Sequence, residues 1–132
     1  MKYMLDTNIC IYAQKQNPAV LHQFHEKASD GLAISIITLA ELEHGAAKSS
    51  RPEKSRVALI KFLSLVSVLL FDEKAAYEYG KIRADLEKKG TPIGPLDMQI
   101  AAHAKAENLI TVTNNVREFQ RVEGLIIENW YQ

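Results

Sequence analysis

The chain has 132 residues, which suits a single domain large enough to bury a hydrophobic core of its own. Hydrophobic residues make up 47% of the sequence and charged residues 24%, so the composition excludes a disordered, collagen-like or coiled-coil chain. The 16 basic residues balance 16 acidic ones, which disfavours a generally basic nucleic-acid-binding protein but leaves room for a local basic patch.

Short apolar runs alternate with longer amphipathic stretches, which is the pattern of an α/β fold with a mostly parallel sheet. The expected strands are 3–5, 32–35, 68–71, 110–113 and, at an edge, 125–127. The expected helices begin at about residue 8 and then cover 18–28, 39–47, 52–65, 73–89, 95–107 and 116–120. No repeat or linker divides the chain, so the sequence predicts one domain over residues 1–132, with four to five strands flanked by helices.

Local signals support these helix boundaries. Pro18 and Pro95 suit the first turn of a helix, and Gly90 suits the position just after a helix ends. Thr38 and Glu41 have the three-residue spacing of a capping box. This spacing predicts that Glu41 lies in the first turn of the helix that follows the second strand.

The sequence also predicts where the protein resides. No segment approaches the roughly 18 consecutive apolar residues that a membrane span needs, and Asp6 introduces a charge too early for a signal peptide. The single cysteine, Cys10, excludes an internal disulfide and a four-cysteine zinc site. We therefore expect a soluble, cytoplasmic protein that does not enter a membrane.

Three carboxylates are expected at one edge of the predicted sheet. Asp6 ends the first strand, Glu41 follows the second strand, and Asp97 lies in the first turn of a later helix. Asn114 and Asn115 come directly after the fourth strand. Because ligands bind beyond the carboxyl ends of the strands in open α/β sheets, these side chains are predicted to converge on one pocket.

Each acid has a structural explanation when it is taken alone. Glu41 would belong to the capping box, Asp97 would interact with the helix dipole, and Asp6 would accept hydrogen bonds from the next helix. Carboxylates gathered at one place nevertheless repel each other unless a cation lies between them. Oxygen ligands without cysteine suit Mg²⁺ or Mn²⁺, and such a site favours hydrolysis of a phosphodiester.

Four segments of the chain together carry a family resemblance. They are MLDTN at 4–8, TLAELEHG at 38–45, GPLDMQIAAHA at 94–104 and VTNNVREF at 112–119. In this order and with this spacing they resemble the PIN-domain ribonucleases of the VapC toxin type, and the resemblance covers essentially the whole chain. It implies a PIN-like domain over residues 1–132, in which Asp6, Glu41 and Asp97 match the family's metal-coordinating acids.

The resemblance also implies an activity and its partners. Members of this family are metal-dependent endoribonucleases, so Mg²⁺ is the expected cofactor and Mn²⁺ a possible substitute. The expected substrate is RNA, with tRNA, and initiator tRNA in particular, as the leading candidate. A VapB-type antitoxin is the expected inhibitor, and operator DNA is expected to be bound only through that antitoxin.

Two further residues complete the candidate catalytic set that the resemblance implies. Asn115 stands where many PIN domains have a further acid, so the site should carry less negative charge and hold any second metal weakly. Thr113 matches a small hydroxyl residue of the family that orients Asp6 or a water molecule. The candidate catalytic residues are thus Asp6, Glu41, Asp97, Asn115 and Thr113.

Two surface features bear on binding. The segment 48–61 carries five basic residues against one acid, and it is either an ordinary solvated face or a strip that contacts RNA phosphates. The resemblance implies a homodimer, and apolar and aromatic residues of the helix expected at 73–89 give it modest support. These residues are Tyr77, Tyr79 and Ile82.

Two other functions are weighed on the sequence alone. A phospho-signalling receiver domain has a similar length and α/β architecture, and Asp72 follows the third strand, where a receiver carries its phosphoacceptor. A receiver would also need an acidic pair after the first strand and a lysine after its last strands, and neither is present. A phosphatase with an Asp-x-Asp motif is disfavoured because Asn8 stands in place of the second aspartate.

Overall fold

The computed structural model describes residues 1–131, and over these residues five parallel strands form one sheet in the order β3-β2-β1-β4-β5. The strands are β1 Tyr3–Leu5, β2 Leu32–Ser35, β3 Ser67–Leu69, β4 Ile110–Val112 and β5 Ile127–Glu128. The helices are α1 Thr7–Gln14, α2 Pro18–Lys27, η1 Ala28–Asp30, α3 Ile36–Ala47, α4 Pro52–Leu63, α5 Glu73–Lys89, α6 Pro95–Ala106 and α7 Val116–Phe119. The predicted α/β class with its parallel sheet is therefore confirmed. Among the described residues no helix is long and apolar enough to cross a membrane.

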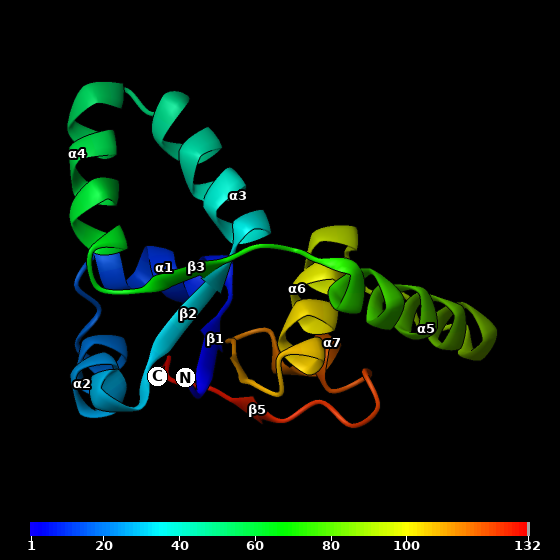
Figure 1. Ribbon diagram of the computed structural model, residues 1–132. Helices are drawn as coiled ribbons and strands as arrows, with labels where there is room; N and C mark the ends of the chain where they lie inside the picture. The colour runs from blue at the N-terminus through cyan, green and yellow to red at the C-terminus, as the bar shows by residue number, and fades with distance from the viewer. Residues whose placement is uncertain (132) are drawn as a thin grey trace.

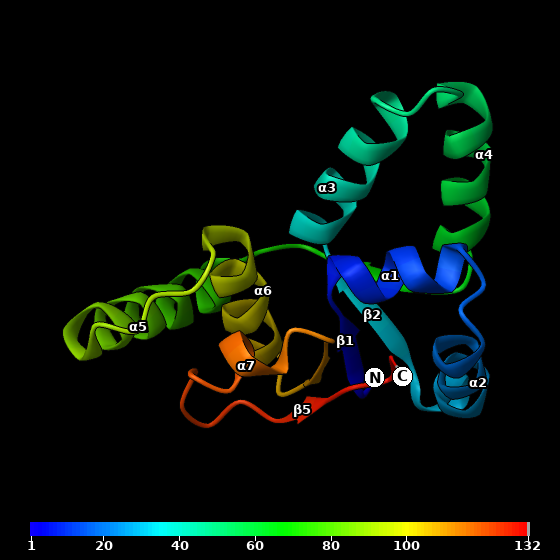
Figure 2. The same cartoon turned by 180° about the vertical axis from the view of Figure 1, so that it is seen from behind.

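The central strand β1 separates two apolar clusters, one on each face of the sheet. Tyr3 and Leu5 belong to the cluster under α1 and α2, whereas Met4, between them, packs with residues of α5 and α6. This division follows from the two-residue period of side chains along a strand. Figures 1 and 2 show it from both sides, with α1 and α2 on one side of the strands and α6 and α7 on the other.

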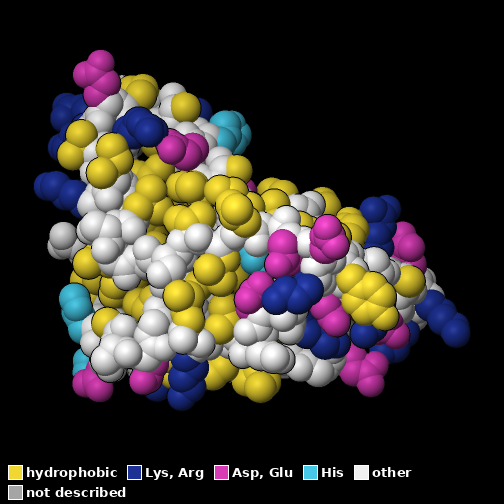
Figure 3. Space-filling view, in the orientation of Figure 1, with side chains coloured by type: hydrophobic (Ala, Val, Ile, Leu, Met, Phe, Trp, Pro, Cys, Tyr) yellow, Lys and Arg dark blue, Asp and Glu magenta, His cyan; other side chains and the backbone are white. Residues whose placement is uncertain are grey.

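Two pairs of helices extend from the sheet. Helices α3 and α4 pack against each other as a hairpin, and α5 packs along α6 on the other side of the molecule. Figure 1 shows the hairpin at upper left and α5 at right, and Figure 3 shows the surface hollowed between them. The carboxyl ends of β1, β2 and β4 lie beneath this hollow, which is where the sequence predicts the polar pocket.

Helix α3 begins earlier than the capping-box spacing predicts. It starts at Ile36, and its N-cap is Ser35, whose Oγ accepts a hydrogen bond from the Ile37 amide at 3.1 Å. Thr38 is a buried residue inside the helix, and Glu41 lies in the second turn, so the capping-box prediction is wrong. The apolar pair after Ser35 continues the strand pattern and hides the boundary. Every other helix and strand boundary lies within two residues of its predicted position.

The strand order excludes the receiver-like alternative. A receiver sheet has the order 2-1-3-4-5, with its first strand between the second and third. Here β1 lies between β2 and β4. Asp72 has a structural role instead, because it is the N-cap of α5 and accepts a hydrogen bond from the Ala75 amide at 3.1 Å.

The three α5 residues that support the homodimer prediction differ in how exposed their side chains are. Ile82 is buried in the cluster between α5 and α6, and Tyr79 is half-buried against the same cluster. Tyr77 alone of the three is fully exposed, at 68%. Ile82 is therefore a core residue rather than an interface residue, and the homodimer stays a prediction.

Candidate active site

Asp6 lies at the carboxyl end of the central strand and is the N-cap of α1. It is only 3% exposed and accepts two hydrogen bonds, from the Ile9 amide at 2.9 Å and from Thr113 Oγ1 at 2.5 Å. Thr113 directly follows β4, the neighbour of β1, so the two side chains meet because parallel strands end at the same edge of the sheet. The Thr113 hydroxyl thus fixes one carboxylate oxygen of Asp6, and its catalytic use stays a prediction.

Glu41 reaches the same edge from α3. It accepts a hydrogen bond from Thr7 Oγ1 at 2.6 Å, and Thr7 is the first residue of α1. Thr38, one turn earlier on α3, lies 3.5 Å from the same hydroxyl. The hydrogen bond between Thr7 and Glu41 therefore connects the start of α1 to α3 beside Asp6.

Asp97 lies in the first turn of α6, opposite the start of α7. Asn115, the N-cap of α7, donates from Nδ2 to Asp97 Oδ2 at 3.2 Å and also to a carboxylate oxygen of Glu118. Burial raises the pKa of Asp97; the hydrogen bond from Asn115 lowers it, and the charges of Glu118 and Glu41 raise it. One amide group therefore bridges two acids that would otherwise face each other.

The acids act on each other electrostatically. Burial raises the pKa of Asp6 from its ordinary 3.8 to about 6, although the hydrogen bonds from Thr113 and the Ile9 amide oppose this. The negative charges of Asp97 and Glu41 raise the same pKa further. The structure therefore brings the three predicted acids, which are far apart in the sequence, into one electrostatic site.

The chemistry of the side chains at this acidic rim suits a divalent cation. Within residues 1–131 none of Asp6, Glu41 and Asp97 forms an ion pair with a basic side chain. In that same part of the chain no three acidic, histidine or cysteine side chains are placed to hold a metal ion as they stand. Glu41 is hydrogen-bonded to Thr7, and Asp97 is hydrogen-bonded to Asn115. Hard oxygen donors that repel each other and lack a cationic partner are the donor set that Mg²⁺ prefers.

Sequence reasoning missed one acid, Glu118, and did not distinguish between the two amides Asn114 and Asn115. Glu118 joins the rim through Asn115, so the expected loss of negative charge at position 115 is offset three residues later. Its only signal in the sequence is the spacing of three, which puts Asn115 and Glu118 on neighbouring positions of a helix. Asn114 is exposed and accepts a hydrogen bond from Asn129 at 3.2 Å. Of the two asparagines, it is Asn115 that is hydrogen-bonded to an acid within residues 1–131.

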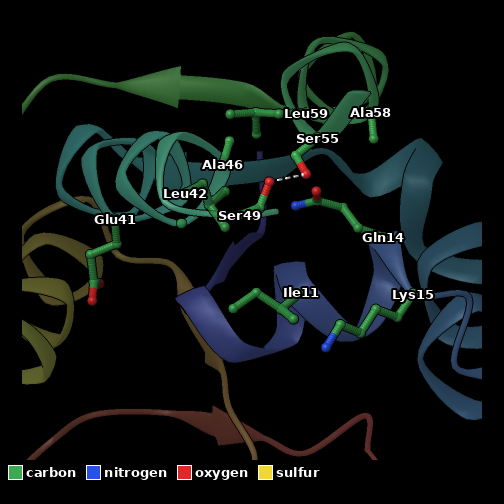
Figure 4. A pocket seen from close by; sticks show the side chains of 11 residues that line it. Ile11, Gln14, Lys15, Glu41, Leu42, Ala46, Ser49, Ser55, Ala58 and Leu59 are labelled. Atoms are coloured by element: carbon green, nitrogen blue, oxygen red, sulfur yellow. Dashed lines mark hydrogen bonds between the residues drawn. The ribbon is translucent and has the colours of Figure 1, made fainter. Parts of the chain in front are cut away.

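An apolar groove of about 440 Å³ adjoins the rim, between α1 and the α3–α4 hairpin. Figure 4 shows Glu41 at one end, its carboxylate directed away from the other lining side chains, and the hydrogen-bonded pair Ser49 and Ser55 farther along. Gly45 of α3 also lines the groove, and a Cβ added there would meet nothing within 4 Å. The groove and the rim therefore share Glu41. Its apolar walls include Ile11, Leu42, Ala46, Ala58 and Leu59.

The basic segment 48–61 forms the turn of the hairpin and much of α4. Its five cations are all exposed, and Figure 3 shows basic side chains over the outside of the hairpin. One of them, Arg56, is held by Glu43 at 2.6 Å. Contact of this segment with RNA stays a prediction. The cations are Lys48, Arg51, Lys54, Arg56 and Lys61.

Comparison with known proteins agrees with this geometry. The PIN domain family matches residues 3–125. The chain is 45% identical to the tRNA(fMet)-specific endonuclease VapC of Salmonella typhimurium and 47% identical to the ribonuclease VapC2 of Haemophilus influenzae, in each case over 98% of both chains. It also superposes with a TM-score of 0.94 on a chain of the VapBC2 complex of Rickettsia felis bound to a promoter DNA fragment, at 44% identity and over 98% and 99% of the two chains.

The chain therefore belongs to the PIN-domain family. Within that family it is a ribonuclease toxin of the VapC type, because full-length relatives with this name share nearly half of its residues. The resemblance drawn from the four sequence segments is confirmed.

The raised pKa of Asp6 predicts how stability depends on pH. Below about pH 4 Asp6 is protonated in both states, whereas between pH 4 and 6 the unfolded chain releases its proton and the folded protein keeps it. The metal-free folded protein therefore loses stability over this interval and does not recover it above pH 6. Asp6→Asn should remove this penalty and stabilise the metal-free protein above pH 6 by at most about 3 kcal/mol.

Urea unfolding of both proteins between pH 3.5 and 8 measures this difference. The control is Asp30→Asn, because Asp30 is an exposed acid that precedes the amino end of β2, whereas the rim lies at the carboxyl ends of the strands. An Asp6→Asn protein that is no more stable than the wild type at pH 7.5 would contradict the prediction.

Proposed function

We propose that this chain is a divalent-metal-dependent endoribonuclease toxin that cuts tRNA, with initiator tRNA as its substrate. The observation that carries the metal dependence is the convergence of Asp6, Glu41 and Asp97 at one rim without a basic partner. The name of the Salmonella typhimurium relative, which specifies tRNA(fMet), supports the choice of substrate. The side chains of this rim would bind the metal ion and orient its ligands.

Asp6, Glu41 and Asp97 would hold the ion, and Glu118 lies beside them. Bound Mg²⁺ or Mn²⁺ would lower the pKa of a water molecule and offset negative charge on the scissile phosphate. The protein prepares this site with neutral groups: Thr113 fixes Asp6, Thr7 fixes Glu41, and Asn115 separates Asp97 from Glu118. These groups orient the carboxylates without cancelling the charge that attracts the ion.

The groove beside the rim suits an inhibitory antitoxin. Its walls are mainly apolar, with Gln14 and Lys15 on the α1 side. Glu41 at its end offers a negative charge to a partner's lysine or arginine. We therefore propose that a VapB-type antitoxin lies in the groove and directs a basic side chain at the acids. The Rickettsia felis complex, which binds promoter DNA, supports contact with operator DNA through the antitoxin. Homodimerisation and residence in the cytoplasm are part of the same proposal.

The first test is cleavage by charge-neutral variants of the rim. Asp6→Asn and Asp97→Asn keep the size of the side chain and remove its charge, so RNA cleavage in Mg²⁺ should fall at least ~10²-fold. Measured on initiator tRNA, with Asp30→Asn as control, this result would support the site. Full activity in either variant would reject it, and because Asp6→Asn is expected to be more stable than the wild type, unfolding would not explain a loss.

The second test exchanges the bridging amide for an acid. Asn115→Asp cannot donate to Asp97 and Glu118, so two hydrogen bonds become repulsions and the metal-free protein should lose about 1–3 kcal/mol of stability. The added anion should in turn tighten Mn²⁺ binding, measured by calorimetry. Asn114→Asp, an exposed neighbour with the same change in charge, is the matched control. Unchanged Mn²⁺ stoichiometry and affinity in Asn115→Asp would place Asn115 outside the metal site.

The third test fills the groove. In Gly45→Phe the new side chain should project into open space at the groove and leave RNA cleavage largely intact. Inhibition by the antitoxin should weaken at least ~10-fold, because the antitoxin would lose a well-packed apolar contact. Gly80→Phe is the control, because Gly80 is also an exposed helical glycine with no atom near its Cβ position. Equal inhibition of the two variants would show that the antitoxin binds elsewhere.

A further inference from the structure

A buried histidine and a buried serine connect the two helices that carry the outer acids. His103 of α6 and Ser35 at the start of α3 are each completely buried. His103 Nδ1 lies 2.8 Å from Ser35 Oγ, a hydrogen bond between residues 68 positions apart. In the part of the chain that the structure describes, it is the one side-chain hydrogen bond that joins these two helices.

The bond lies the same number of residues along each helix from the acid which that helix carries. Glu41 follows Ser35 by six residues along α3, and His103 follows Asp97 by six residues along α6. Six residues of α-helix span roughly 9 Å, and a helix of this length is stiff. A shift at the Ser35–His103 contact is therefore transmitted along both helices to the carboxylates at the rim.

The protonation of the pair is set by its surroundings. Ser35 Oγ already accepts a hydrogen bond from the Ile37 amide, so its own proton is free to be donated to Nδ1 of a neutral imidazole. Burial lowers the pKa of His103, which favours that neutral ring, whereas the charges of Glu107 and Asp72 and a backbone contact with Leu70 raise it. Phe71 packs edge-on against the imidazole with 5.5 Å between ring centres.

The histidine is not the residue that packing alone would select. Within residues 1–131 its buried Nε2 forms no hydrogen bond of good geometry, and an unsatisfied buried polar atom destabilises a protein by about 1–3 kcal/mol. A leucine would fill much of the same space without that penalty. The polar ring is therefore better explained by the bond it makes to Ser35 than by its contribution to the core.

We propose that Ser35 and His103 are a positioning pair that fixes α3 against α6 and thereby sets the separation of Glu41 and Asp97 for binding one divalent cation. This proposal rests on the proposed metal-dependent nuclease function. It assigns to neither residue a contact with the metal ion or the RNA.

Ser35→Ala and His103→Leu remove the bond from either side. Each should weaken Mn²⁺ binding by about 10-fold and lower kcat by a similar factor with little change in KM for RNA, because the groups that support metal ligands typically contribute this much. The double variant should be no worse than the single ones, since they remove the same bond. His103→Asn, whose amide can occupy the place of Nδ1, should restore most of the Mn²⁺ affinity.

Leu86→Ala separates positioning from general loss of stability. Leu86 is buried between α5 and α6, so this change should lower the melting temperature at least as much as Ser35→Ala or His103→Leu does. It should leave the Mn²⁺ affinity near that of the wild type. Wild-type Mn²⁺ affinity and kcat in Ser35→Ala and His103→Leu would overturn the proposal, as would an equal loss in Leu86→Ala. A wild-type protein that neither binds Mn²⁺ nor cuts RNA would reject the proposed function itself, which distinguishes the two failures.

Discussion

A carboxyl group buried at the end of the central strand is the constraint on which the arrangement of the rim depends. Asp6 is almost fully enclosed, and burial with the charges of two nearby acids opposes its ionisation. A buried charge is tolerated only when hydrogen bonds or an opposite charge compensate it. Thr113 and the Ile9 amide supply the hydrogen bonds, and no basic side chain within the described residues supplies the charge. The remaining unfavourable energy is what a bound cation would relieve.

The parallel sheet explains why such a site forms at this edge. Strands β1, β2 and β4 deliver the chain to the same side of the sheet, where α1, α3 and α7 begin. Helix α6 follows α5 rather than a strand, and it also begins near the acids, because Asp97 in its first turn is bonded by Asn115. Asp6 caps α1, Asp97 lies in the first turn of α6 and Asn115 caps α7. The partial positive charge of helix amino termini stabilises nearby anions without neutralising them. The fold therefore holds several carboxylates together while keeping them available to a cation.

Much of this arrangement is predictable from the sequence, and the failures have physical reasons. Asp6, Glu41 and Asp97 follow recognisable strands or open helices, so their convergence follows from the topology of a parallel sheet. The start of α3 was misplaced because Ser35 both ends a strand and caps a helix, and the apolar residues after it suit either structure. The helix pattern counts Ile82 among the apolar residues that support a homodimer, because the packing of α5 against α6, which buries Ile82, depends on tertiary contacts that a single helix pattern does not show.

Glu118 shows how a site can keep its charge when one position changes. A neutral side chain at position 115 suggests a less acidic rim, yet Glu118 in the first turn of α7 shares the amide of Asn115 with Asp97. An aspartate at 115 would add its charge to those of Asp97 and Glu118, whereas the amide donates a hydrogen bond to each of them. The asparagine therefore allows two carboxylates to approach each other in the absence of metal. The negative charge expected at 115 is supplied from 118, and the amide between the acids makes their proximity compatible with a stable fold.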